Sequence, residues 1–211
     1  MDKLIFILVL LGVAVYSYLI GSINCSILIS RFFHKDVRDS GSGNAGATNM
    51  VRAFGPGIGV LTMLGDFLKT LVALVITRLL FGGEIYWQAM VAFSGFCCSM
   101  GHAFPLYFGF RGGKAVTVVG MVFLVVDWRC FAIGISVFIL TVLITRFISL
   151  GSMLAAISGP ITMFVIKRSE PHGWYIALSL LALAVMIIIL HRENLKRLVK
   201  GEERRFKFKK D

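Results

Sequence analysis

Charged residues are scarce in this chain. Asp, Glu, Lys and Arg together make up 16% of its 211 residues, whereas 57% are hydrophobic. Soluble domains carry about 25% charged residues, and the mean hydropathy of this chain is +0.85. An ordinary soluble domain is therefore excluded. The composition predicts an all-α integral membrane protein, with residues 1–211 forming a single membrane-embedded domain.

Cysteine, histidine and acidic residues are also few. The four cysteines lie in or beside apolar runs, and none belongs to a CxxC pair or to a set with metal-ligand spacing. We therefore expect no disulfide framework, no metal site and no cofactor. The shortage of acidic residues leaves a net charge of +11. Most basic residues lie in loops and in the tail, where they set topology and contact anionic membrane lipid, so we expect no nucleic-acid partner.

Apolar runs predict about seven transmembrane helices, some of them short. They span residues 4–29 (interrupted by a polar patch at 21–24), 56–81, 85–100, 115–126, 130–145, 150–166 and 174–190. A spanning helix needs about 20 apolar residues, so the short fourth to sixth runs leave five spans as an alternative. The first run lacks a small-residue cleavage pattern, which favours a retained span over a signal peptide.

Basic residues divide unevenly between the two sides that seven spans define. Sixteen Lys and Arg lie on the side of the loops 31–52, 105–114 and 146–149 and of the tail 191–211, against five on the other side. Because cytoplasmic loops carry the positive excess, we expect the N-terminus outside, and the glycine-rich loops and basic tail in the cytoplasm. Polar segments from four places in the chain then face one compartment, as a shared site requires.

The segment from Ser40 to Arg52 is the most distinctive stretch. It holds three glycines, and no large apolar side chain precedes Met50. Glycines permit sharp turns that expose backbone N–H groups to an anion, and the forked guanidinium of Arg52 matches phosphate oxygens. Further donor side chains come from Ser42, Asn44, Thr48 and Asn49. We therefore predict a phosphate-binding loop at the membrane surface.

Three other polar groups accompany this loop. The loop 101–114 ends in Arg111-Gly112-Gly113-Lys114, where two glycines precede a cation. In the tail, His191 and Asn194 are three residues apart and share a helix face. Asp66 and Lys69 share a face within the second span, either as a structural ion pair or as part of a polar site facing the bundle interior.

Other motif matches fail or remain as alternatives. The GxGxxG match at 41–46 has no strand before it, so a dinucleotide site is excluded. The loop 101–114 departs from Walker spacing at Phe108 and Ala115. The His-x4-Asp spacing of His34 and Asp39 leaves open an acyltransferase that uses acyl-CoA or acyl-carrier protein. An anion transporter is the other alternative, although the halves show no repeat and the polar motifs cluster at one membrane face.

With these motifs in place, the chain resembles the acyl-phosphate-dependent glycerol-3-phosphate acyltransferases of bacterial phospholipid synthesis, the PlsY family. Three motifs carry the resemblance: 41–49 with Arg52, 101–105 running to 111–114, and 191–194 running through 197–198 to Gly201 and Glu203. The chain departs from the family pattern at four positions. Asn24 and Ala45 stand where the family commonly has prolines, and Thr70 and Ala115 where it commonly has glycines.

The resemblance implies transfer of a fatty acyl group from acyl phosphate to the 1-hydroxyl of glycerol 3-phosphate. It implies a multi-pass protein of the bacterial inner membrane, with acyl phosphate supplied by a soluble acyl-carrier-protein phosphate acyltransferase. A substrate phosphate oxygen or His191 would accept the hydroxyl proton, and no covalent enzyme intermediate is required. The implied catalytic residues are Ser42, Arg52, Lys114 and His191. The implied substrate-binding residues are Gly43, Asn44, Thr48, Asn49, Ser149 and Asn194.

Overall fold

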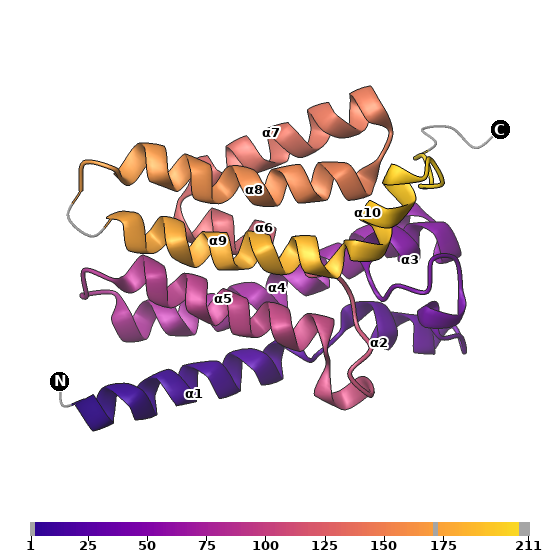
Figure 1. Cartoon of the computed structure of the whole chain (residues 1–211). Coiled ribbons are helices and arrows are strands. Elements are labelled where there is room, and N and C mark those ends of the chain that lie inside the picture. The colour runs from indigo at the N-terminus through magenta and orange to yellow at the C-terminus, as the bar shows by residue number, and fades with distance from the viewer. Residues whose placement is uncertain (1–2, 171–172, 207–211) are drawn as a thin grey trace. The chain divides into compact units, whose positions relative to one another are not determined.

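The computed structural model describes residues 3–170 and 173–206, and all regular structure in them is helical (Figure 1). Within these residues the α-helices are α1 (Lys3–Gly21), α2 (Cys25–Phe32), α3 (Ala47–Phe54), α4 (Pro56–Phe81), α5 (Trp87–Ala103), α6 (Val116–Val126), α7 (Trp128–Thr145), α8 (Ile148–Lys167), α9 (Gly173–Leu190) and α10 (Arg192–Val199). Two short 3₁₀ helices, η1 (Val37–Asp39) and η2 (Leu106–Phe108), lie in the loops.

All seven predicted apolar runs are helices in the structure. Within the described residues, five helices are long and apolar enough to span a membrane, and α9 makes a sixth when it is taken with α10, to which it is bent by 60°. The remaining apolar helix, α6, has 11 residues, which is about 16 Å of helix against a hydrocarbon core of about 30 Å. The predicted all-α membrane fold is confirmed. Single-domain organisation stays a prediction.

The polar segment 31–52, expected as a loop, contains more helix than predicted. The interruption at 21–24 separates α2 from α1, because Asn24 caps α2 by accepting a hydrogen bond from the Ile27 N–H at 3.1 Å. The helix α3 then forms from Ala47 to Phe54, with Met50 fully buried. Gly55, at φ 90°, ends α3 before α4 begins at Pro56.

The chain packs as two compact units, residues 1–122 and 123–211, each described by itself. In the first unit, α1 packs on α5 with their backbones in direct contact. A Cβ on Gly21 would overlap the carbonyl of Cys98, and one on Gly101 would overlap the carbonyl of Tyr18. This close approach, common between membrane helices, sets the break after α1 beside the loop that follows α5 (Figure 1).

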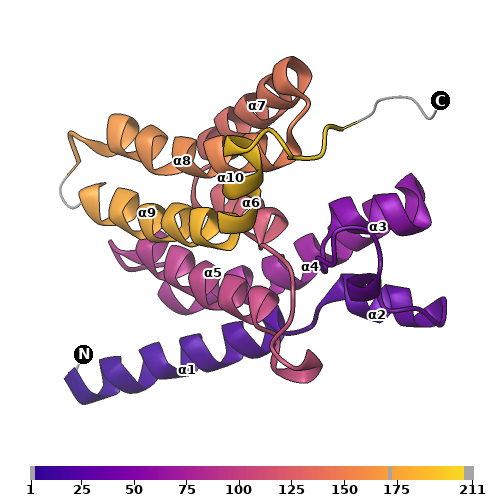
Figure 2. The same ribbon diagram turned by 45° about the vertical axis from the view of Figure 1, so that its right-hand side comes forward.

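In the second unit, α7, α8 and α9 follow one another as neighbours, as both views show (Figures 1 and 2). The turn between α7 and α8 uses Arg146 in a left-handed conformation, with its N–H bonded to Val142 O at 2.8 Å. The tail returns to this turn, because Phe206 N donates to Arg146 O at 2.7 Å. Ser149 at the start of α8 therefore lies beside the segment that follows α10.

Candidate active site

The loop 40–46 is organised by one buried side chain, that of Asn49. Its amide oxygen accepts the Ser42 N–H at 2.9 Å. Its amide nitrogen donates to Val37 O at 3.0 Å and to Ser40 O at 2.9 Å. Asn49 is 1% exposed, and these bonds use both ends of its amide. Asn49 thus holds the loop in shape from its buried side, and its predicted contact with substrate stays a prediction.

The glycines of this loop serve turns and close packing. Gly41 and Gly43 have φ values of 61° and 70°, which favour glycine. A Cβ on Gly41 would also overlap the Asn49 amide oxygen. The expectation that the glycines expose their N–H groups differs from the structure. Gly43 N donates to Ser40 O and Gly46 N to Asn44 O, each at 3.0 Å.

Several side chains of this segment remain available to bind a ligand, although the glycine N–H groups described above are already hydrogen-bonded. Among the described residues, the side chains of Ser42, Asn44 and Thr48 form no hydrogen bond, and none of the three is buried. Gly46 caps α3 without a side chain, so the first N–H groups of α3 point from its N-terminus without a side-chain acceptor. Arg52 lies exposed in the last turn of α3. The groups of this segment that can donate hydrogen bonds to an anion are thus side chains and the N-terminus of α3.

The two glycine-rich loops are joined at Ala45. Its N–H donates to Gly112 O at 3.4 Å, and its carbonyl accepts from the Asn24 side chain at 3.4 Å. Ala45 is fully buried, in an apolar cluster with Ile27, Val37 and Met50. A proline, which the family resemblance led us to expect at this position, has no N–H to donate. The alanine therefore makes a link between the loops that proline cannot make.

The second loop delivers Lys114 from a tightly packed backbone. Gly112 N donates to Ala103 O at 3.0 Å, and Gly113 N donates to His102 O at 3.1 Å. Lys114 follows directly and is half-buried. Ala115 then adopts φ 57°, a left-handed conformation that costs a non-glycine residue about 1–2 kcal/mol. The bond from Ala45 to Gly112 brings this loop beside the segment that carries Ser42.

Arg38 braces the second loop from η1. Its Nη1 donates to Phe108 O at 2.8 Å and to Arg111 O at 3.3 Å. Its Nε and Nη2 bind the Asp36 carboxylate at 3.0 and 2.7 Å, and these bonds hold the pKa of Asp36 below its usual value. By contrast, His34 and Asp39 are both exposed, and within the described chain no hydrogen bond or ion pair joins them. The catalytic His–Asp pairing that their spacing suggested is absent there.

In the second unit, the predicted residues Ser149 and Asn194 meet at the carboxylate of Glu203. Glu203 Oε1 accepts from Ser149 Oγ at 2.8 Å and from Asn194 Nδ2 at 2.6 Å. Glu203 Oε2 accepts from Arg197 Nε at 2.8 Å. Burial would raise the pKa of this carboxyl, but the three hydrogen bonds outweigh burial and hold its pKa below the usual value. The cluster has one carboxylate and one guanidinium, with hydroxyl and amide donors between them.

His191 is buried at the junction of α9 and α10. Its Nδ1 lies 2.8 Å from Ile187 O. A carbonyl oxygen only accepts hydrogen bonds, so Nδ1 carries a proton, and in the neutral ring the basic lone pair resides on Nε2. Asn194 follows one turn later on the same face. The ring is thus held in one orientation and one tautomer, as a histidine that accepts a proton must be.

A family profile described as Glycerol-3-phosphate acyltransferase matches residues 11–201. The chain belongs to the glycerol-3-phosphate acyltransferase family. A family member from Geobacter sulfurreducens is 40% identical over 90% of this chain and 94% of its own length. Another from Pseudomonas syringae pv. tomato is 40% identical over 92% of this chain and 96% of its own length.

Two solved structures extend the likeness to three dimensions. The crystal structure of PlsY (YgiH), an integral membrane glycerol 3-phosphate acyltransferase, in its glycerol 3-phosphate form is 35% identical, with a TM-score of 0.83 over 94% of this chain and 96% of that one. Its lysophosphatidic acid form is 34% identical, with a TM-score of 0.80 over 94% and 95% of the two chains. The predicted family, enzyme class and membrane fold are confirmed for this member of the glycerol-3-phosphate acyltransferase family.

Sequence reasoning missed the three residues that hold the loops and the tail of this acyltransferase in place. The sequence placed Glu203 in a motif without a role, gave Arg38 no role within the basic segment 31–52, and marked Asn24 as a departure from the family pattern. Each has at least one partner distant in sequence: Glu203 bonds to Ser149, Arg38 to Phe108 and Asn24 to Ala45. A weak signal existed for Glu203, since it is one of only four acidic residues among nine basic residues in the tail 191–211.

Proposed function

We propose that the chain transfers a fatty acyl group from acyl phosphate to the 1-hydroxyl of glycerol 3-phosphate. The hydroxyl oxygen bonds to the acyl carbonyl carbon, and the bond from that carbon to the phosphate oxygen breaks. The products are 1-acylglycerol 3-phosphate (lysophosphatidic acid) and inorganic phosphate, which leaves with the hydroxyl proton. Family membership and the relative whose crystal forms contain glycerol 3-phosphate and lysophosphatidic acid support this choice.

The observation that carries the proposal is the junction of the two loops at Ala45 and Gly112. This junction holds the loop that carries Ser42 against the loop that carries Lys114. A hydroxyl donor and a cation therefore come from two loops that pack together. We assign phosphate holding to Ser42, Arg52 and Lys114, with Gly43 providing the turn. Both substrates carry phosphate, which accounts for the surplus of donors over carboxylates.

Placement of glycerol 3-phosphate falls to a second group of polar residues. In this proposal Asn44 and Thr48 donate to it from the first loop, where their side chains form no hydrogen bond within the described chain. The family resemblance implies the same role for Ser149 and Asn194, and Glu203 holds both of these side chains by hydrogen bonds. Asn49 acts indirectly, through the loop that it organises.

Acyl phosphate is a mixed anhydride, already activated for attack by a hydroxyl. Positioning and charge neutralisation then supply the rate, without a serine or cysteine nucleophile or a covalent intermediate. We favour a substrate phosphate oxygen as the proton acceptor. His191 is the second candidate, because its bond to Ile187 O leaves the basic lone pair on Nε2. A pH profile of kcat that loses its acid limb in His191→Gln would favour the histidine.

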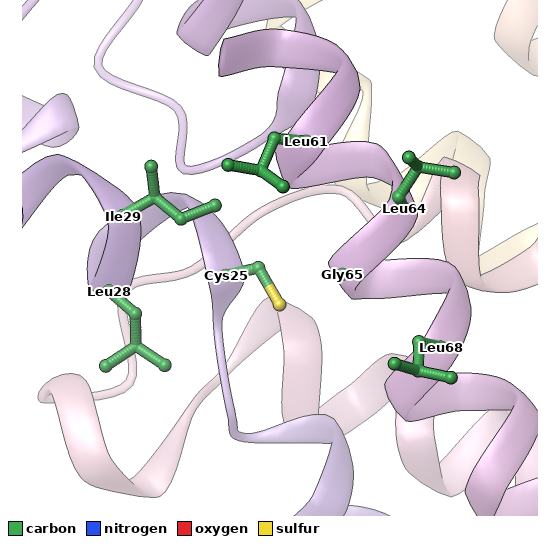
Figure 3. Close-up of a pocket in the computed structure, with 7 residues that line it drawn as sticks. All are labelled: Cys25, Leu28, Ile29, Leu61, Leu64, Gly65 and Leu68. Atoms are coloured by element: carbon green, nitrogen blue, oxygen red, sulfur yellow. The ribbon is translucent and has the colours of Figure 1, made fainter.

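The acyl chain needs an apolar channel, and the first unit has one between α2 and α4. A groove of about 370 Å³ is lined by Cys25, Leu28, Ile29, Leu61, Leu64, Gly65 and Leu68 (Figure 3). Ile29 also packs against the apolar cluster that holds Ala45. The groove therefore adjoins the underside of the first loop, and we assign the fatty chain to it.

The setting of the reaction follows from the same proposal. We place the protein in the bacterial inner membrane, with the N-terminus outside and the C-terminus in the cytoplasm, on the distribution of Lys and Arg. Both glycine-rich loops then face the compartment that contains glycerol 3-phosphate. The acyl phosphate comes from a soluble acyl-carrier-protein phosphate acyltransferase, and it reaches the groove through the lipid phase.

The test is an assay of the purified protein in detergent, with glycerol 3-phosphate and either acyl phosphate or acyl-CoA, following release of inorganic phosphate and formation of lysophosphatidic acid. We expect turnover with acyl phosphate alone. Turnover with acyl-CoA alone would refute the donor and revive the alternative raised by His34 and Asp39. Inertness toward both donors, together with phosphate uptake into proteoliposomes, would identify a transporter.

A further inference from the structure

The first unit contains a buried charged cluster that the proposed chemistry does not use. Lys69 on α4 lies 2.9 Å from the Asp66 carboxylate, and its side chain is 6% exposed. His102, near the end of α5, places Nδ1 3.0 Å from Lys69 Nζ and 3.6 Å from Asp66 Oδ1. Burying such charges is costly unless they are paired, and within a membrane they commonly have a specific role.

Lys69 joins three segments through its ammonium group. Besides His102, it donates to Gly21 O at 3.0 Å and to Ile23 O at 2.6 Å. These carbonyls end α1 and begin the break before α2, where helix carbonyls lack intrahelical partners. A cation at a helix C-terminus is favoured. Lys69 therefore ties the end of α1 to α4 and α5.

The same contact fixes the state of His102. An ammonium group only donates hydrogen bonds, so Nδ1 of His102 must accept, and Nε2 carries the proton. A doubly protonated ring would place an N–H against the ammonium group. The cluster thus holds His102 neutral, in one tautomer, with its ring orientation set by Lys69.

His102 in turn packs against the two adjacent glycines of the second loop, Gly112 and Gly113. Its carbonyl accepts the Gly113 N–H at 3.1 Å. A Cβ on Gly112 would overlap that carbonyl, and a Cβ on Gly113 would overlap Nε2 of the ring. Both glycines therefore lie directly against His102, and Lys114 is the next residue along the chain. The orientation of His102 decides where the backbone of Lys114 begins.

We propose that Asp66, Lys69 and His102 form a positioning relay, which sets the backbone of Gly112 and Gly113 and so aims Lys114 at the phosphate. This inference rests on the proposed phosphate-holding role of Lys114. The proposed function assigns no substrate contact to any of the three, so in this proposal they are positioning residues. Displacing a catalytic cation by about 1 Å lowers rates by up to about a hundredfold.

The first test removes both charges together, because Lys69→Met alone would leave Asp66 buried and unpaired. In the Asp66→Asn/Lys69→Met variant we expect the KM for the phosphate-bearing substrates to rise by about tenfold or more, within the range that misplacement allows. Thr77→Val is the matched control. Thr77 is buried on the same helix and bonds only within it and to Tyr16, away from the second loop.

A second pair of variants tests His102 itself. His102→Asn keeps an acceptor near the position of Nδ1 for Lys69, whereas His102→Leu removes it. We expect His102→Asn to retain most of the activity that His102→Leu loses, at comparable melting temperatures in detergent. If Asp66→Asn/Lys69→Met fails to fold, these two His102 variants still test whether the cluster positions the second loop. Equal loss in both variants would overturn the role assigned to the Lys69–His102 contact.

Hydrogen–deuterium exchange supplies a readout that does not depend on turnover. Peptides that cover residues 109–117 should exchange faster in Asp66→Asn/Lys69→Met than in the wild type or in Thr77→Val, because the Gly113 N–H loses its fixed acceptor. Unchanged exchange together with unchanged KM values would overturn the relay. A wild-type protein inert toward acyl phosphate would refute the proposed function, and the exchange data would still decide whether the cluster holds the loop.

Discussion

Replacing Asn49 by alanine tests whether the first loop owes its shape to one buried amide. The substitution removes hydrogen bonds to Ser42 N, Val37 O and Ser40 O, of 2.9, 3.0 and 2.9 Å. At about 1 kcal/mol of net stabilisation for each bond, the loss is about 3 kcal/mol. For a chain of this size the melting temperature should fall by about 6–12 °C. The KM for glycerol 3-phosphate should rise as well, since the loop loses its support.

The matched comparison is Asn44→Ala in the same loop. The Asn44 side chain is half-exposed and forms no hydrogen bond within the described residues. We therefore expect an unchanged melting temperature and a raised KM for glycerol 3-phosphate, because a substrate contact is lost without a scaffold contact. Thermal unfolding in detergent and initial-rate kinetics on the same preparations separate the two effects.

Two melting temperatures would contradict this role of Asn49. If Asn49→Ala melts within about 1 °C of the wild type, fewer than the expected bonds stabilise the native state. If Asn44→Ala lowers the melting temperature as much as Asn49→Ala, the division between a buried organiser and an exposed contact is wrong. Asn49→Asp adds a sharper check. It keeps the acceptor for Ser42 but turns an oxygen toward the two carbonyls, so it should destabilise at least as much as alanine.

Other substitutions address the remaining parts of the site. Lys114→Ala should abolish acyl transfer while thermal unfolding in detergent shows a folded protein. Ala115→Gly should stabilise the fold by up to about 1 kcal/mol, seen as a higher melting temperature, because glycine relieves the left-handed strain at φ 57°. Glu203 has a depressed pKa in the folded state, so its stabilisation is present above its ordinary value of 4.5 and is lost as the pH falls through the lower folded value. Melting temperature should thus decline less steeply on acidification in Glu203→Gln than in the wild type. Gly65→Leu should shift preference to shorter acyl chains in a competition assay, because even a Cβ there lies 2.8 Å from Cys25 Sγ across the groove.

The helices, and the approach of the two glycine-rich loops to each other, could be predicted from the sequence. Long apolar runs leave the backbone no alternative to helix in a membrane, and the prediction of 56–81 coincides with α4. The short helix α3 was missed because its glycine-rich approach reads as loop. Of its apolar residues, Met50 and Phe54 pack on the cluster around Ala45.

Residues that act through long-range contacts were beyond sequence reasoning. Asn49 looked like one more donor in a polar loop, and only its burial beneath Val37 and Ser40 reveals an organiser. Glu203 reaches Ser149, which is 54 residues earlier in the chain, after Gly201 reverses the chain at φ 72°. Such pairings depend on how helices cross, and no local pattern in a single sequence encodes that geometry.

For the proposed phosphate site, the internal hydrogen bonds of both loops decide which groups can bind the anion. In a phosphate-binding nest the glycine N–H groups point at the anion. Here the N–H groups of Gly43, Gly46, Gly112 and Gly113 all donate to protein carbonyls. In the proposed function, phosphate therefore meets side chains such as that of Lys114 and the N-terminus of α3, and the position of these groups depends on how the loops pack. Gly113→Ala should accordingly fail through overlap with His102 and Ala45, since it removes no donor and no charge.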